Sequence, residues 1–251
     1  MNDLTMEQWR ALYDDLSAED FLEISKNQRK KGVQQLRKKA QGSLEKQALL
    51  LEAWHKRNEP KKKLLSKGAI LIGGVDEAGR GPLAGPVVAS VVVLASPILG
   101  LRDSKKLSEK RREEFFHIIK SEALGYGVGW ADQKEIDKLN ILRATKLAMK
   151  RAIDKLGFNL DALLLDGTPM NLHPQEWALI GGDDLSNEIA AASILAKVTR
   201  DHWMIEMDEH FPIYGFAQHK GYGTAKHIQA LKDFGPCHLH RKSFLSFLND
   251  K

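Results

Sequence analysis

The chain has 251 residues, of which 43% are hydrophobic and 28% charged, so it can bury the core of one large domain with a smaller appendage. Its longest apolar stretch is much shorter than the roughly 20 residues of a membrane helix, and the N-terminal sequence MNDLTMEQW lacks the apolar segment of a signal peptide. The single cysteine excludes an internal disulfide and a multi-cysteine zinc site and is typical of the reducing cytoplasm, whereas the net charge of +5 weakly favours an anionic partner.

The first 65 residues differ in charge pattern from the rest. Residues 1–25 carry seven acids and one base, whereas residues 26–63 carry thirteen bases and three acids. Apolar residues recur at helical spacing, with Gly32, Gly42 and Pro60 as expected breaks, so we predict a small helical appendage over residues 1–65. Its basic half has two interpretations, a solvated helix face or an arm that contacts the phosphates of a nucleic acid.

From residue 68 to residue 251, the pattern predicts an α/β domain with a helical C-terminal segment. Short apolar runs bounded by turn residues predict strands at 69–75, 86–94, 124–132, 161–167 and 177–182. Amphipathic or long apolar segments predict helices at 107–123, 137–157 and 187–211. Ser108 is the expected N-cap of the first of these helices, and Gly157 is expected to close the second. This order indicates a mixed sheet with helices packed on its faces.

Acidic residues lie at the ends of three predicted strands. They are Asp76 with Glu77, Asp166, and Asp183 with Asp184. Strand ends gather at one edge of an α/β sheet, so these carboxylates are expected to converge. Converging carboxylates repel one another unless a cation neutralises them, and their hard oxygen ligands suit Mg²⁺ or Mn²⁺. The alternative is that each aspartate is an ordinary turn or capping residue.

The segment GGVDEAGRGPLAGP, residues 73–86, raises a geometric question. Side chains of adjacent strand residues point to opposite faces, so Asp76 and Glu77 could not both reach one site from a regular strand. The glycines that follow allow the backbone to turn, and we therefore expect the strand to stop or bulge at the two acids.

Six segments together resemble one family. They are GVDEAGRGPLAGPVVASVVVL (74–94), DSKKLSEKRRE (103–113), LLLDG (163–167), IAAASILAKVTRD (189–201), HKGYGT (219–224) and LHRKSF (239–244). In this order and spacing they resemble ribonuclease HII, over about residues 68–247. The resemblance implies a ribonuclease-H-like fold and an endoribonuclease that uses Mn²⁺ or Mg²⁺, by a two-metal-ion mechanism that leaves 3′-hydroxyl and 5′-phosphate ends. The implied partners are RNA/DNA hybrids and duplex DNA that contains ribonucleotides, and we expect a monomer without membrane association.

The resemblance also implies a set of site residues. The catalytic and metal-binding acids would be Asp76, Glu77, Asp166 and Asp183. The implied substrate-binding residues are Gly79, Arg80, Gly81, Ser104, Lys105, Lys106 and Tyr222. In this set Gly79, Arg80 and Gly81 would grip the ribonucleotide, Tyr222 would stack on the sugar that follows it, and the remaining three would contact the phosphate backbone.

One segment departs from the family's pattern. Where the family usually shows Lys-Gly-Asp, this chain has Gly181-Gly182-Asp183-Asp184, so Asp184 is an alternative fourth carboxylate. The usual lysine is missing and Glu188 stands where a serine is usual, so the local pKa tuning and phosphate contact are not carried over from the resemblance. Two other functions stay open: a ribonuclease HIII-type enzyme, and a non-catalytic nucleic-acid-binding module of the same fold.

Overall fold

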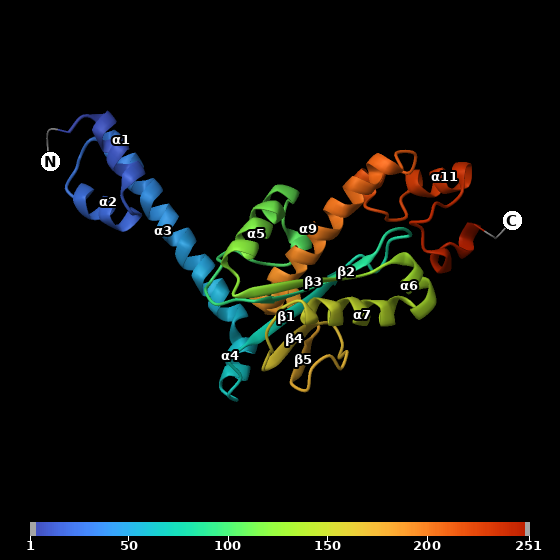
Figure 1. Ribbon diagram of the computed structural model, residues 1–251. Helices are drawn as coiled ribbons and strands as arrows, with labels where there is room; N and C mark the ends of the chain where they lie inside the picture. The colour runs from blue at the N-terminus through green and yellow to red at the C-terminus, as the bar shows by residue number, and fades with distance from the viewer. Residues whose placement is uncertain (1–3, 249–251) are drawn as a thin grey trace. The chain divides into compact units, whose positions relative to one another are not determined.

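The computed structural model describes residues 4–248, and these divide into two compact units, one ending at His55 and the other beginning at Lys56. Four helices make up the N-terminal region (Figure 1): α1 (Met6–Asp15), α2 (Ala18–Ser25), α3 (Lys31–Arg57) and α4 (Glu59–Leu65). The expected break at Gly42 is wrong, because α3 continues through it. One interior glycine costs a helix only about 1 kcal/mol. Pro60 does lie at a helix start, in the first turn of α4.

The first unit has a small apolar core of its own. Trp9, Phe21, Val33 and Ala40 are fully buried there. The rings of Trp9 and Phe21 pack edge to face with their centroids 6.1 Å apart. These contacts join α1 and α2 to α3.

A five-stranded mixed sheet organises the second unit. Its strands are β1 (Ile72–Ala78), β2 (Val87–Val93), β3 (Gly125–Ala131), β4 (Ala162–Asp166) and β5 (Glu176–Leu179), in the order β3-β2-β1-β4-β5. β1, β2 and β3 are antiparallel neighbours, and β4 runs parallel to both β1 and β5. The predicted mixed sheet is therefore confirmed.

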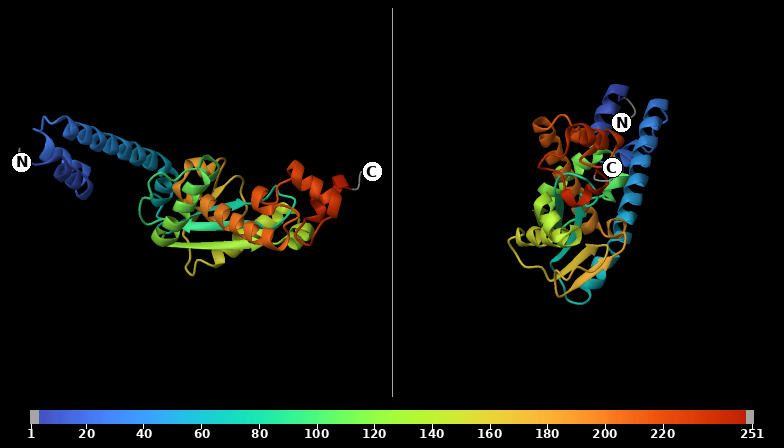
Figure 2. Two further views of the ribbon diagram at one scale, coloured as in Figure 1. Left: turned by 90° about the horizontal axis from the view of Figure 1, so that it is seen from above. Right: turned by 90° about the vertical axis from the view of Figure 1, so that its right-hand side faces the viewer.

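Helices cover both faces of this sheet (Figures 1 and 2). α7 (Ile141–Asp154) lies on one face, and α9 (Asn187–His210) lies on the other with α5 (Glu109–Glu122) beside it. Ser108 caps α5 as predicted and accepts a hydrogen bond from the amide of Arg111. Two glycines in β3 permit the close approach of α7, since a Cβ at Gly127 or Gly129 would lie 2.0 Å from a helix carbonyl oxygen.

The structure divides the predicted helix 137–157 into α6 (Gln133–Leu139) and α7. Asn140 lies between them with φ at 68°, and its side chain caps α7 by accepting from the amide of Arg143. Asparagine tolerates positive φ better than most residues, and this property ends α6 where apolar periodicity predicted continuation.

Shorter elements complete the second unit. They are α8 (Gly182–Leu185), α10 (Phe216–His219), α11 (Ala225–Phe234) and three 3₁₀ turns (Ser104–Lys106, Lys242–Phe244 and Ser246–Leu248). Between residues 4 and 248, no helix is both long and apolar enough to span a membrane.

Candidate active site

Three aspartates from separate elements come together at one edge of the sheet. Asp76 lies in β1, Asp166 ends the adjacent parallel strand β4, and Asp183 lies in α8. One oxygen from each carboxylate lies within 4.8 Å of the others. The convergence expected from sequence is therefore present, although Asp183 does not end a strand. β5 stops at Leu179, and the short helix that follows carries Asp183.

These carboxylates are placed where ionisation is costly. Asp76 is 5% exposed, and burial, with Glu77 and Asp166 nearby, raises its pKa well above the usual range. Burial and the neighbouring Asp103 and Asp166 raise the pKa of Asp183 to about 6. The Gly182 amide donates to Asp166 Oδ1 over 2.7 Å and so orients that carboxylate toward the group.

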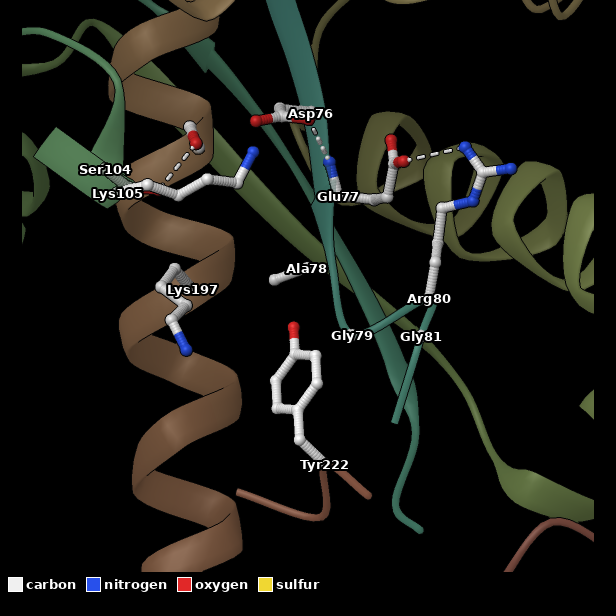
Figure 3. A pocket seen from close by; sticks show the side chains of 11 residues that line it. Asp76, Glu77, Ala78, Gly79, Arg80, Gly81, Ser104, Lys105, Lys197 and Tyr222 are labelled. Atoms are coloured by element: carbon white, nitrogen blue, oxygen red, sulfur yellow. Dashed lines mark hydrogen bonds and ion pairs between the residues drawn. The ribbon is translucent and has the colours of Figure 1, made fainter. Parts of the chain in front are cut away.

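The expected interruption of β1 at the two acids is wrong. β1 pairs with β2 in unbroken register through Asp76, Glu77 and Ala78. Asp76 therefore faces α9, and Glu77 points to the other face, as Figure 3 shows. There Glu77 Oε1 lies 3.2 Å from Arg80 Nη1, and burial raises the pKa of Glu77 against the opposing effect of Arg80.

Asp184 differs from Asp183 in its surroundings. Its exposed carboxylate pairs with Lys106, and it is not in the group formed by Asp76 and Asp166. Asp184 does lie with Asp183 and Asp103 in a second acidic group whose oxygens are within 4.8 Å of one another. The geometry thus favours Asp183 over Asp184 as the partner of the two strand aspartates.

A cavity of about 440 Å³ opens beside the carboxylates (Figure 3). Its lining residues are Asp76, Glu77, Ala78, Gly79, Arg80, Gly81, Ser104, Lys105, Ser193, Lys197 and Tyr222. The cavity thus brings together every predicted substrate-binding residue except Lys106. Arg80 reaches it from the turn after β1, and Tyr222, which is 43% exposed, faces it from the turn before α11.

Lys105 lines the cavity and interacts electrostatically with the carboxylates. Burial acts to lower the pKa of Lys105, but the carboxylates of Asp103, Asp183 and Asp76 outweigh that effect and the pKa is raised. Ser104 has little freedom to contact a ligand, since it is 3% exposed and its hydroxyl oxygen lies 2.9 Å from that of Ser193.

Two lining residues on α9 were not predicted. Ser193 hydrogen-bonds with Asp76, and Lys197 pairs with Asp201 over 2.7 Å. Ser193 and Lys197 are four positions apart, so they share one face of α9. Polar residues at this spacing in the otherwise apolar run IAAASILAKV were the signal that could have identified them.

The carboxylate group fits a divalent cation. Its members are hard oxygen donors, at least two of them are buried with raised pKa values, and bound positive charge would favour their ionised form. Asp76, Asp166 and Asp183 would hold such an ion. Glu77 would have to leave Arg80 to join them.

Comparison with known proteins identifies the family. The family model for ribonuclease HII matches residues 73–247. The chain belongs to the ribonuclease HII family. A ribonuclease HII of Ruminiclostridium cellulolyticum is 55% identical over 72% of each chain, and that of Bacillus subtilis is 44% identical over 97% of each chain. The crystal structure of a ribonuclease H2 from Pyrococcus horikoshii shares the fold, with a TM-score of 0.61, 23% identity, and coverage of 72% of this chain and 100% of that one.

The similarity to these relatives and the assembled acidic site show that the chain is a ribonuclease HII-type endoribonuclease. The fold and the enzyme class expected from the sequence are confirmed. The individual roles assigned to Asp76, Glu77, Asp166, Asp183 and the cavity residues stay predictions.

The departures from the ribonuclease HII pattern have structural explanations. Glu188 lies away from the cavity, fully buried, and its Oε1 is 2.8 Å from Lys61 Nζ. Gly181, where the family usually has lysine, has a φ of 67° at the start of α8. Arg57 instead supplies a cation near Asp183, and its Nη2 donates to the Asp183 carbonyl oxygen over 2.6 Å.

Proposed function

We propose that this enzyme hydrolyses the RNA strand of RNA/DNA hybrids and incises duplex DNA on the 5′ side of an embedded ribonucleotide, leaving 3′-hydroxyl and 5′-phosphate ends. The observation that carries the proposal is a cavity lined by Asp76, one member of the carboxylate group, together with Gly79–Arg80–Gly81 and Tyr222. A scissile phosphate and the ribose beside it would occupy the two parts of this single cavity.

Asp76, Asp166, Asp183 and Glu77 would bind Mn²⁺ or Mg²⁺. When bound, a pair of such ions activates water and stabilises the leaving oxygen of a phosphodiester. Arg80 would release Glu77 and bind a phosphate instead, since its planar guanidinium matches the geometry of phosphate oxygens. Lys105 and Lys197 would neutralise further phosphate charge at the cavity wall.

The remaining cavity residues would recognise the ribonucleotide. A 2′-hydroxyl both donates and accepts hydrogen bonds, and it distinguishes RNA from DNA. The main chain at Gly79 and Gly81 can approach it because no Cβ intervenes. Tyr222 would lie against the following deoxyribose. Since the carboxylates and the cavity come from one chain, we expect a monomer, and the single cysteine favours the cytoplasm.

The test is a duplex with one ribonucleotide, incubated with the protein with and without Mn²⁺ or Mg²⁺, with the cut position mapped. We expect metal-dependent cleavage on the 5′ side of the ribonucleotide. The Asp76→Asn variant should cleave more than about 100-fold more slowly than the parent while still binding the duplex. Loss of a metal ligand costs more activity than loss of the contacts that support the ligand. Uncut substrate with either metal, or normal turnover by Asp76→Asn, would contradict the proposal and favour a binding module.

A further inference from the structure

Two arginines that contact the turn between β1 and β2 are buried without an acidic partner. Arg200 in α9 is 1% exposed, and Arg241 in the segment after α11 is fully buried. Among the residues that the structure describes, no carboxylate lies within 4.0 Å of either guanidinium. Burial lowers the pKa of Arg200 to about 10 and that of Arg241 to about 9, so both stay charged at neutral pH.

Arg241 directs its guanidinium entirely at main-chain oxygens of the turn between β1 and β2. Nη2 donates to Gly79 O over 2.6 Å and to Pro86 O over 3.1 Å. Nη1 donates to Arg80 O over 2.9 Å, and Nε donates to Gly85 O over 2.8 Å. A planar fork with fixed donor directions holds these oxygens in one arrangement, which the single ammonium of lysine could not do.

Arg200 joins the same turn to the segment that carries Tyr222. It donates to Pro86 O over 2.9 Å, to Ala84 O over 3.1 Å and to Lys220 O over 2.9 Å. Its guanidinium carbon also lies 6.0 Å from the centroid of the Tyr222 ring. The two walls of the cavity are therefore connected through one buried cation.

These contacts determine where the amides of the turn point. Every described peptide bond is trans, so the carbonyl and the N–H of one peptide unit point in opposite directions. When Arg241 holds the oxygens of Gly79 and Arg80, the amides of Arg80 and Gly81 must point away from it. Within residues 4–248, neither of these two amides donates a hydrogen bond to the protein, and both residues line the cavity (Figure 3).

Gly79 is required for this arrangement. Its φ is 89°, and a Cβ there would lie 2.1 Å from Arg200 Nε. The glycine thus permits both the left-handed turn and the approach of the buried arginine.

We infer that Arg241 and Arg200 are positioning residues that set the preference of the enzyme for a ribonucleotide over a deoxyribonucleotide. They do so by directing the Arg80 and Gly81 amides toward the ribose and by holding Tyr222 at a fixed position relative to these amides. This inference rests on the proposed function. It adds that the discrimination depends on two side chains that touch neither the substrate nor the metal ligands.

The test compares Arg241→Gln with Arg241→Lys, and with Lys242→Gln as a control that removes one charge from the exposed neighbour. The dissociation constants of a duplex with one ribonucleotide and of the matched all-DNA duplex are measured in EDTA. The measured quantity is the dissociation constant of the all-DNA duplex divided by that of the ribonucleotide duplex. Both Arg241 variants should lower this ratio by about tenfold, which is the effect of one misplaced hydrogen bond. Affinity for the all-DNA duplex and affinity for Mn²⁺ should stay within about twofold of the parent.

A merely structural role would give a different result. Equal losses of all-DNA binding, Mn²⁺ binding and ribonucleotide binding would overturn the inference, as would an unchanged ratio in Arg241→Gln. Failure of the parent protein to cut at a ribonucleotide would instead contradict the proposed function itself. If neither Arg241 variant unfolds cooperatively, amide hydrogen exchange of the parent decides. The Arg80 and Gly81 amides should become protected by the ribonucleotide duplex in EDTA and not by the all-DNA duplex, and equal protection would overturn the inference.

Discussion

Asp183 and Asp184 are adjacent in the chain, but their side chains have different surroundings. Asp183 is 7% exposed and shares a 4.8 Å group with Asp76 and Asp166. Asp184 is exposed and pairs with Lys106. Metal binding makes use of buried, convergent carboxylates, whereas an exposed ion pair contributes only about 0–1 kcal/mol. The two residues therefore form a matched pair for mutation.

We predict that Asp183→Asn lowers kcat/KM on a single-ribonucleotide duplex by more than about 100-fold, because it removes a metal ligand. Asp184→Asn should change kcat/KM by no more than about threefold, because it loses only a solvent-exposed pair. Steady-state kinetics at saturating Mn²⁺ measure both values, and calorimetric titration with Mn²⁺ should show weakened binding for Asp183→Asn alone. Equal losses in the two variants would instead assign a role to the second acidic group, with Asp103.

At the level of elements, an ion pair between a partly buried lysine and a fully buried glutamate joins α4 to the start of α9. Lys61 Nζ lies 2.8 Å from Glu188 Oε1 and also donates to the carbonyl oxygen of Leu94 over 2.8 Å. Ser186 donates to Glu188 Oε2 over 3.2 Å. Removing one partner of such a pair leaves a charge without compensation, whereas replacing both is often neutral.

We predict that Glu188→Gln lowers the free energy of unfolding by about 3–5 kcal/mol, because Lys61 is then left without its counter-charge. The double variant Glu188→Gln with Lys61→Met should recover most of that loss. Urea unfolding followed by circular dichroism measures the three free energies. Equal stability of Glu188→Gln and the parent would show that the pair does not hold α4 in place.

The sequence predicted these elements unevenly, for physical reasons. β-branched runs such as that of β2 identify buried strands directly, and Ser108 identifies the start of α5. The break at Asn140 depends on one positive φ, which apolar periodicity does not encode. The position of Asp183 in α8 likewise depends on a turn at Gly181 that shortens β5.

At the scale of the whole molecule, sequence order and resemblance predicted that Asp76, Asp166 and Asp183 meet, but not how charges are paired. Arginine is usually exposed, so sequence alone does not indicate that Arg241 is buried against carbonyl oxygens 155 to 162 positions earlier in the chain. The contact of Glu77 with Arg80 was also missed, because β1 was expected to stop or bulge at the two acids and so to bring both of them to one site. Such pairings depend on tertiary structure.

A cluster of histidines contacts the main chain of Tyr222 in the second unit. The Cys237 amide donates to His240 Nδ1 over 3.0 Å, a shorter contact than the 3.3 Å from this nitrogen to the Cys237 carbonyl oxygen, which favours the tautomer with the proton on Nε2. His240 Nε2 then donates to His227 Nε2 over 3.0 Å, and His227 Nδ1 donates to Tyr222 O over 2.9 Å. His219 stacks on His227 with 4.4 Å between the ring centroids. This chain of donors requires neutral rings at His227 and His240.

We predict that this cluster destabilises the protein in mild acid. Burial, followed by the proximity of His227, lowers the pKa of His240 to about 4, whereas an unfolded histidine titrates near 6.5. Between these values the unfolded state binds more protons, so stability is lost as the pH falls from 6.5 toward 4, by up to about 3 kcal/mol for His240. The raised pKa of Asp183 has the opposite effect on stability in this pH range, and it acts equally in the parent and in a His240 variant. The measurement is therefore the difference in the free energy of unfolding between the parent and His240→Asn. It is obtained by urea unfolding from pH 7 to pH 4.5, in EDTA. The parent should lose more stability over this range than His240→Asn, and His117→Gln, at an exposed position on α5, should behave as the parent does. Parallel stability curves for the parent and His240→Asn would contradict the prediction.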